Sequence, residues 1–168
     1  TLLKNNTYDT LTIPILKAIF KETPEIENSM LCSVKKYPAT VKRFLASHSR
    51  FMELSFQTPV PVKIAYKTPR TLGMDRLAAI CGAHLVGKGK NTLVINAGTC
   101  ITYDFIDNKA TYQGGSISPG LEMRYKVLHE YTAKLPLVKP DGNFKKLIGG
   151  TTEESIRAGV QGGMAKEV

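Results

Sequence analysis

An aspartate and an arginine, Asp75 and Arg76, stand side by side in the stretch "TPRTLGMDRLAAICGA", which covers residues 68–83. Apolar positions at helical spacing follow them, so the two charges should lie at the beginning of a helix. The positive end of a helix dipole favours an anion there and should keep Asp75 ionised. An ionised carboxylate can take a proton from a substrate hydroxyl, and the adjacent guanidinium can bind a carboxylate or a phosphate through two hydrogen bonds.

The same pair also has a purely structural interpretation. Aspartate is a favoured helix N-cap, and Arg76 would then be an exposed residue of the first turn. On the residue types alone the N-cap is favoured, and proton transfer by Asp75 stays open beside it.

Two glycine-containing stretches are candidates for phosphate binding. In "NAGTC", residues 96–100, Gly98 lets the backbone approach a ligand, Thr99 adds a hydroxyl, and successive backbone N–H groups can form an anion-binding hollow. In "GGSISPG", residues 114–120, a glycine pair leads into an expected helix start, where unpaired N–H groups suit phosphate. An ordinary hairpin turn and an ordinary strand-to-helix loop are the alternatives, and the residue types alone favour them.

Apolar spacing predicts the elements that would position these residues. Helices are expected at 8–21, 38–47, behind Asp75, at 118–136 and at 151–168, and strands at 29–34 and 51–56, followed by an extended segment at 58–69. The helix behind Asp75 should bury one face, formed by Leu77, Ile80, Cys81 and Leu85. Residues 92–115 are typical of an antiparallel meander, with Asp104 on the same face as Thr102.

Capping signals and a linker divide this pattern further. Ser118 is expected to cap the helix at 118–136, with Pro119 in its first turn. Thr151 and Glu154 stand at capping-box spacing before the last helix. The turn-rich "GKGKN" at 87–91 suggests a boundary between two domains, residues 1–88 and 89–168. The mixture of helices and strands predicts an α/β or α+β class.

Composition bounds the function classes. The 168 residues are 42% hydrophobic and carry a net charge of +9, with 14 Lys and Arg against 6 Asp and Glu in residues 1–90. The lysines are scattered, without a nucleic-acid-binding motif, so nucleic acid is not the expected partner. No apolar run is long enough to cross a bilayer, and the three separated cysteines favour a reducing compartment, so a cytoplasmic protein is expected.

Four stretches, in this order and at this spacing, together resemble type III pantothenate kinase. They are "YKTPRTLGMDR" (66–76), "NAGTCITYD" (96–104), "GGSISPGLEMR" (114–124) and "TAKLP" (132–136). The match runs from about residue 60 to about residue 160, and the first 55 residues contribute little to it.

The resemblance implies the two-domain, ribonuclease-H-like fold of actin, sugar kinases and acetate kinase. It implies transfer of the ATP γ-phosphoryl group to the hydroxyl of pantothenate, giving 4'-phosphopantothenate in the first step towards coenzyme A. Asp75 then matches the proposed general base. The pantothenate-binding positions match Tyr66, Gly73, Met74, Asp75, Arg76 and, across a homodimer interface, Thr152, with Thr151 as the alternative. Gly98 and Thr99 match the positions that contact ATP, and Mg²⁺ and a monovalent cation (K⁺ or NH₄⁺) are the implied cofactors.

The chain departs from the family pattern at three points. Asn96 stands where the family has an aspartate that binds the monovalent cation, so an uncharged amide oxygen replaces a carboxylate. The family's first phosphate motif, Asp-x-Gly-Asn-Thr, is expected amino-terminal to Thr1, and a later glycine-rich segment is expected beyond Val168. Two alternatives stay open: a non-catalytic regulator on the same scaffold, which Asn96 and the positive charge favour, and a different phosphoryl acceptor.

Overall fold

The computed structural model describes residues 4–33 and 36–168, which form two compact units. The first unit comprises the described residues up to 60 together with residues 67–81. The second comprises residues 61–66 and 82–168. The domain boundary between residues 88 and 89 stays a prediction. In the described part of the chain, no helix is both long and apolar enough to span a bilayer.

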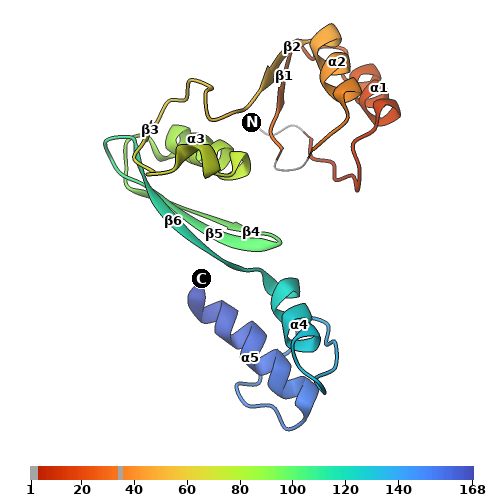
Figure 1. Cartoon of the computed structure of the whole chain (residues 1–168), viewed down its shortest axis with the longest axis vertical. Coiled ribbons are helices and arrows are strands. Elements are labelled where there is room, and N and C mark those ends of the chain that lie inside the picture. The colour runs from red at the N-terminus through yellow and green to blue at the C-terminus, as the bar shows by residue number, and fades with distance from the viewer. Residues whose placement is uncertain (1–3, 34–35) are drawn as a thin grey trace. The chain divides into compact units, whose positions relative to one another are not determined.

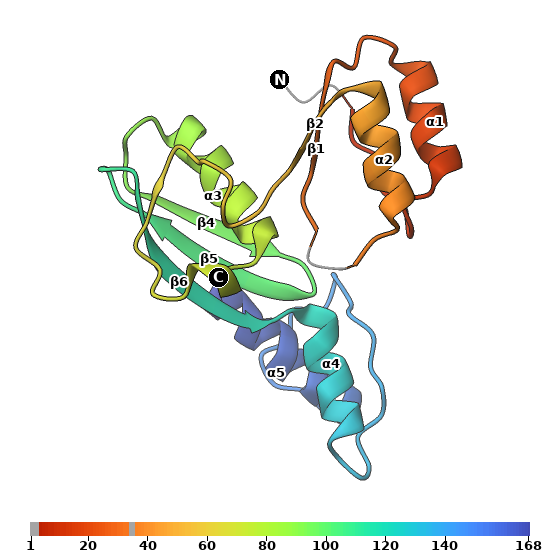
Figure 2. The same ribbon diagram turned by 45° about the horizontal axis from the view of Figure 1, so that its top comes forward.

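The first unit pairs two helices with a small parallel sheet. Up to residue 60 its elements are α1 (Ile13–Glu22), β1 (Asn28–Leu31), α2 (Ala39–His48) and β2 (Arg50–Glu53). The helices α1 and α2 lie side by side in both views (Figure 1, Figure 2). Their core is apolar, with Phe20 edge-on to Phe44 at 5.6 Å between ring centroids.

Prolines decide where these elements begin. Pro14 lies in the first turn of α1, where its missing N–H group costs no helical hydrogen bond, so the helix begins five residues later than the apolar pattern predicted. Pro38 is the N-cap of α2, in an extended conformation. The strand expected at 29–34 ends at Leu31, and its last predicted residue, Val34, lies outside the described residues.

A short 3₁₀ turn, η1 (Pro69–Thr71), precedes α3 (Met74–Gly87). Leu77 and Ile80 are buried as expected, but Leu85 is 68% exposed and does not belong to the buried face. The reason is helical geometry, because eight residues at 100° each place Leu85 about 80° around the helix from Leu77.

The second unit contains a four-stranded mixed sheet of order β3-β6-β5-β4. Its strands are β3 (Lys63–Ile64), β4 (Thr92–Ala97), β5 (Cys100–Ile106) and β6 (Thr111–Pro119). The last three form the predicted antiparallel meander (Figure 1), while β3 pairs in parallel with β6. Only two residues of the extended segment at 58–69 form a strand, since Pro59 and Pro61 cannot donate to a ladder.

Two helices complete this unit and pack side by side, α4 (Leu121–Glu130) and α5 (Thr152–Glu167) (Figure 2). Their shared core contains Tyr125, Val138, Ile156 and Val160. Parallel and antiparallel pairing combined with packed helices confirms the predicted α/β class.

The prediction that Ser118 caps a helix is wrong. Ser118 pairs with Ile101 in the β5–β6 ladder, and β6 continues through Pro119, so Gly120 becomes the N-cap of α4. The glycine pair at 114–115 also lies within the strand and not in a loop. A Cβ atom at Gly115 would lie 1.9 Å from the Tyr103 carbonyl oxygen, so glycine is required for the close approach of two strands.

Replacing Gly115 with alanine should therefore destabilise the fold. The added Cβ meets backbone, which cannot rotate away, and we expect a loss of about 1–3 kcal/mol or more in the free energy of unfolding. Gly163→Ala is the matched control, because its Cβ would meet nothing within 4 Å inside α5 and should stabilise by roughly 0.5–1 kcal/mol. Urea unfolding of both variants measures the difference, and equal effects would contradict the packing role of Gly115.

Candidate functional site

The amino end of α3 carries the first group of candidate residues. The backbone N–H of Leu77 donates to the Gly73 carbonyl at 3.0 Å, so the helix begins at Met74 and Asp75 is its second residue. The interpretation of Asp75 as the N-cap is therefore wrong, because Gly73 occupies that position. Asp75 still serves the helix start, since its Oδ1 accepts a hydrogen bond from the backbone N–H of Arg76 at 2.9 Å.

A glycine at position 73 leaves space for this carboxylate. A Cβ atom there would lie 2.5 Å from Oδ1 of Asp75. The Asp75 side chain is exposed, and in the described part of the chain its second oxygen, Oδ2, has no hydrogen-bond donor. One carboxylate oxygen is thus held by the helix backbone while the other is available to a ligand.

Burial distinguishes Arg76 from its neighbour. Its residue is only 6% exposed, so the expectation of an exposed first-turn arginine is wrong. Cys32, just after β1, belongs to the same unit, and both burial and the Asp75 carboxylate raise the pKa of its thiol. The first unit therefore brings the end of β1 close to the start of α3.

The turn between β4 and β5 carries the second group, Gly98 and Thr99. The backbone N–H of Gly120 donates to the Thr99 carbonyl at 2.9 Å. A Cβ atom at Gly120 would lie 2.2 Å from the Gly98 oxygen and 2.5 Å from the Thr99 oxygen. The hairpin turn and the first turn of α4 are thus packed backbone against backbone, and the two stretches proposed separately for phosphate meet in one place.

A cavity of about 650 Å³ opens at this junction. Its lining combines the turn, residues along α4 and one residue beyond that helix: Gly98, Thr99, Leu121, Glu122, Met123, Lys126, Val127, Glu130 and Pro140. The N–H groups at a helix start and a lysine suit an anion, whereas Glu122 and Glu130 each add a negative charge to the lining. The sequence analysis did not identify Lys126. Its position could have indicated it, because a lysine in the second turn of a helix that follows a glycine motif can reach a bound phosphate.

Tyr66 lies in the second unit against the sheet. Its ring stacks on Tyr112 with centroids 5.9 Å apart, and its Cδ2 lies 3.8 Å from the position of a Cβ at Gly114. The Tyr112 hydroxyl donates to Oδ1 of Asp104 at 2.7 Å, and both residues are buried. The Asp104–Tyr112 pair therefore supports Tyr66, and only Asp104 was noticed in the sequence.

Asn96 stands on β4 directly opposite Thr102 of β5, so their side chains project from the same face of the hairpin. Thr102 is 8% exposed, and among the described residues its buried Oγ1 has no hydrogen-bond partner. An amide oxygen beside an unsatisfied hydroxyl oxygen is a neutral oxygen donor set. Such a set fits a monovalent cation better than Mg²⁺, which favours carboxylates and phosphates.

Thr151 and Thr152 have different roles at the start of α5. Thr151 is the N-cap, and its Oγ1 accepts from the backbone N–H of Glu154 at 3.2 Å. The Glu154 carboxylate accepts from the backbone N–H of Gly150 at 2.7 Å, one residue before the expected partner of a capping box. The Thr152 side chain instead lines a groove, and the described residues offer its hydroxyl no hydrogen bond.

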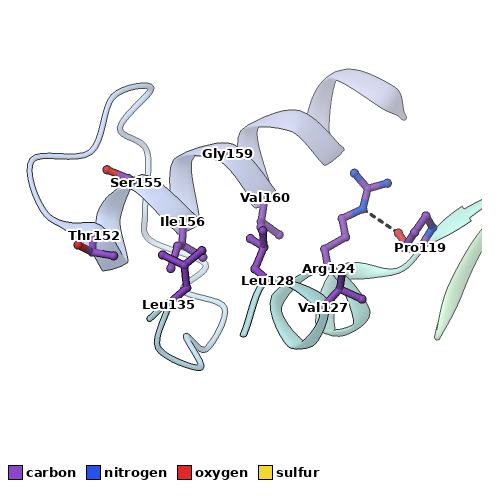
Figure 3. A pocket seen from close by; sticks show the side chains of 10 residues that line it. All are labelled: Pro119, Arg124, Val127, Leu128, Leu135, Thr152, Ser155, Ile156, Gly159 and Val160. Carbon is purple, nitrogen blue, oxygen red and sulfur yellow. Dashed lines mark hydrogen bonds between the residues drawn. The ribbon is translucent and has the colours of Figure 1, made fainter. Parts of the chain in front are cut away.

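This groove has a volume of about 620 Å³ and lies between α4 and α5. Figure 3 shows Thr152 at one end and Arg124 at the other, with Ile156 and Val160 between them. Its middle is apolar, so it can hold an apolar part of a ligand or of another protein chain, with a hydroxyl or a guanidinium at either end.

Comparison with known proteins decides the family. The sequence model for type III pantothenate kinase matches residues 2–168. The chain belongs to this family. The resemblance drawn from four motifs is thereby confirmed, and it extends over the first 55 residues, where no motif was visible.

Type III pantothenate kinases of several bacteria are similar to this chain. The protein of Phocaeicola vulgatus is 44% identical over 155 residues, which cover 92% of this chain and 60% of that protein. The protein of Christiangramia forsetii is 45% identical over 148 residues, covering 88% and 60%. The chain therefore spans about 60% of the length of these relatives.

A solved structure supports the fold independently. It is the crystal structure of a Campylobacter jejuni protein proposed as a Baf family transcriptional activator, with a TM-score of 0.53, 23% identity, and coverage of 90% of this chain and 66% of that one. This chain and the Campylobacter jejuni protein thus share an arrangement of helices and strands over most of this chain.

Replacing Thr151 or Thr152 at the start of α5 should change the free energy of unfolding by different amounts. Thr151→Ala removes the cap and should lower the free energy of unfolding by about 1 kcal/mol. Thr152→Ala should change it by less than about 0.5 kcal/mol, because its hydroxyl makes no bond within the described residues. Chemical unfolding of both variants measures this, and a larger loss for Thr152→Ala would contradict the assignment.

Proposed function

We propose that the complete protein transfers the γ-phosphoryl group of ATP to the hydroxyl of pantothenate, giving 4'-phosphopantothenate, the first step of coenzyme A synthesis. One observation carries the proposal. In a chain of the type III pantothenate kinase family, the Gly98–Thr99 turn is packed against the start of α4 beside Lys126, as a phosphate-binding site requires. Thr99 would receive the phosphates of ATP through its backbone N–H group and its hydroxyl. The N–H of Gly98 donates to the Cys100 carbonyl at 2.9 Å, so Gly98 contributes by letting the backbone of the turn approach the phosphates.

Asp75 is the general base of this reaction. In the transfer, the bond between the γ-phosphorus and the β-phosphate oxygen breaks, a bond to the pantothenate oxygen forms, and the hydroxyl proton passes to the Asp75 carboxylate. Because Oδ1 accepts the hydrogen bond from the Arg76 backbone N–H, Oδ2 is the oxygen that receives the proton. Because the transition state is loose, positioning of the hydroxyl matters more than its full deprotonation.

The pantothenate-binding positions implied by the family are Tyr66, Gly73, Met74, Asp75, Arg76 and Thr152. Gly73, Met74 and Arg76 surround Asp75 at the start of α3, and Tyr66 presents an aromatic ring beside Tyr112. In the complete protein we expect a homodimer in which Thr152 of one subunit reaches pantothenate bound to the other. The exposed threonine at the end of an apolar groove supports this, since it is the one hydroxyl of the Thr151–Thr152 pair not used by the cap.

Two cations accompany ATP in this proposal. Mg²⁺ would enter as its ATP complex, held by phosphate oxygens and water. A monovalent cation, K⁺ or NH₄⁺, would be held by the Asn96 amide oxygen beside the Thr102 hydroxyl. It would neutralise phosphate charge near the turn.

Two further points follow from the family and the composition. Three free cysteines fit a reducing compartment, which supports a cytoplasmic location. We expect the two-domain, actin-like architecture in the complete protein. The regulatory alternative gains no support, because the 23% identity to the Campylobacter jejuni protein carries the fold alone.

Pantothenate-dependent release of ADP by the complete protein tests the function, and Asp75→Asn tests the base. We expect the variant to fold normally and to lose about 10²–10⁴-fold in turnover, because the amide cannot accept the proton. Asp9→Asn, an exposed carboxylate of the same unit, is the matched control and should keep full activity. Near-normal turnover by Asp75→Asn would remove Asp75 from the mechanism, and ADP release with another alcohol but not with pantothenate would change the acceptor.

The cation site has its own test. Asn96→Asp adds a carboxylate to the donor set and should lower the potassium concentration for half-maximal activity by about tenfold. Asn91→Asp adds the same charge to an asparagine whose Oδ1 accepts from the backbone N–H of Asn108, away from the turn, and should leave that concentration unchanged. Two results would exclude Asn96 as the ligand. One is the same half-maximal potassium concentration in Asn96→Asp and Asn91→Asp, and the other is equal activity with K⁺ and with Na⁺ in both variants.

A further inference from the structure

Arg124 makes an unusual set of contacts at the junction of β6 and α4. Its Nε donates to the Pro119 carbonyl at 2.8 Å, and its terminal nitrogen donates to the Ser118 hydroxyl at 2.7 Å (Figure 3 shows the first of these). The same terminal nitrogen forms an ion pair with Oε2 of Glu167 in the last turn of α5. The Arg124 guanidinium thus binds the end of β6 and links it to the carboxyl end of α5.

The Pro119 carbonyl belongs to the same peptide group as the Gly120 N–H. That N–H donates to the Thr99 carbonyl in the phosphate turn at 2.9 Å. Arg124 therefore holds the acceptor side of a peptide whose donor side holds the turn. Hydrogen bonds in such a chain polarise and strengthen one another, and a charged donor at one end strengthens the effect.

Glu167 fixes the guanidinium in this orientation. The Ser118 hydroxyl and Arg124 lower the pKa of the Glu167 carboxyl, so it is ionised at neutral pH. The Tyr103 hydroxyl contacts the other carboxylate oxygen at 3.4 Å. The side chains of Arg124 and Glu167 are 20% and 30% exposed, so the pair is partly shielded from solvent and holds its geometry better than a surface pair.

We propose that Arg124 is a positioning residue for the phosphates of ATP. It acts through the Pro119–Gly120 peptide on the Gly98–Thr99 turn and does not itself contact the nucleotide. The proposal rests on the proposed function, because it requires ATP at this turn. A lysine cannot replace Arg124. The planar guanidinium binds the backbone carbonyl through Nε and binds both the hydroxyl and the carboxylate through its terminal nitrogen, and an ammonium group lacks this geometry.

Arg157 offers a matched control within the same unit. Its Nε donates to the Lys139 carbonyl at 3.2 Å and its NH1 pairs with Glu153, so it too joins a carbonyl to a carboxylate. Its side chain is 21% exposed, almost the same as that of Arg124. Among the described residues, the hydrogen bonds and the ion pair of Arg157 do not involve the Gly98–Thr99 turn or the first turn of α4. Replacement of either arginine by lysine keeps the charge and removes a similar set of bonds.

Calorimetric titration of the complete protein with Mg·ATP tests the proposal without relying on turnover. We expect Arg124→Lys to weaken binding by about tenfold or more, as expected when a charged hydrogen bond is lost, and Arg157→Lys to leave it unchanged. In steady-state kinetics Arg124→Lys should raise KM for ATP and leave KM for pantothenate within twofold. If Arg124→Lys folds poorly, Glu167→Gln replaces it, with a smaller weakening of Mg·ATP binding expected.

The outcomes separate the inference from the function. Wild-type affinity for Mg·ATP in both Arg124→Lys and Glu167→Gln would overturn the positioning role, even if thermal stability falls. Equal weakening by Arg157→Lys would show a general effect of stability and overturn it as well. No Mg·ATP binding by the wild-type protein would instead overturn the proposed function, on which the role of Arg124 depends.

Discussion

The close approach of Gly120 to the Gly98–Thr99 turn is the constraint on which the second unit depends. A side chain at position 120 would overlap two carbonyl oxygens, so only glycine permits the contact. The contact requires that β6 end at Pro119 and that α4 begin immediately afterwards. It also requires that β5 and β6 run close together, which Gly115 allows. Strand register, helix start and phosphate turn are therefore parts of one arrangement.

The same arrangement extends into α5 through charge. Arg124 and Glu167 join the strand end to the last turn of α5, while Thr151 caps the other end of that helix. The helix is thus fixed at both ends, and Thr152 is left exposed at the mouth of the apolar groove. A hydroxyl held at one end of a fixed helix is suited to contact a ligand with little loss of conformational entropy on binding.

Local sequence patterns predicted the features that depend on residues close together in the sequence. The meander, the Thr151 cap and the apolar face through Leu77 and Ile80 depend on neighbours in sequence, and the structure confirms them. The start of α4 was misplaced because Ser118 and Pro119 are good helix-start residues, while the pairing of Ser118 with Ile101 is a tertiary contact that outweighs this preference.

Contacts that depend on strand register or on distant residues were not predictable. A register shift between Phe105 and Ile106 brings the Tyr112 hydroxyl to Asp104, and simple alternation does not reveal it. The ion pair between Arg124 and Glu167 spans 43 residues, and no spacing rule predicts it. The N-cap of α3 lies two residues before the predicted one, at Gly73 and not at Asp75, because a glycine without a capping side chain occupies that position. The Asp75–Arg76 pair itself was found from residue types, and its catalytic role came from the family resemblance.

Backbone amide chemical shifts of the complete protein, recorded by NMR as Mg·ATP is added, test most directly whether the turn and the start of α4 form one phosphate site. We expect the amides of Gly98, Thr99 and residues 120–123 to show some of the largest shifts and to saturate together at one dissociation constant. Shifts confined to other segments, with these amides unmoved at saturating nucleotide, would contradict a phosphate site at this junction.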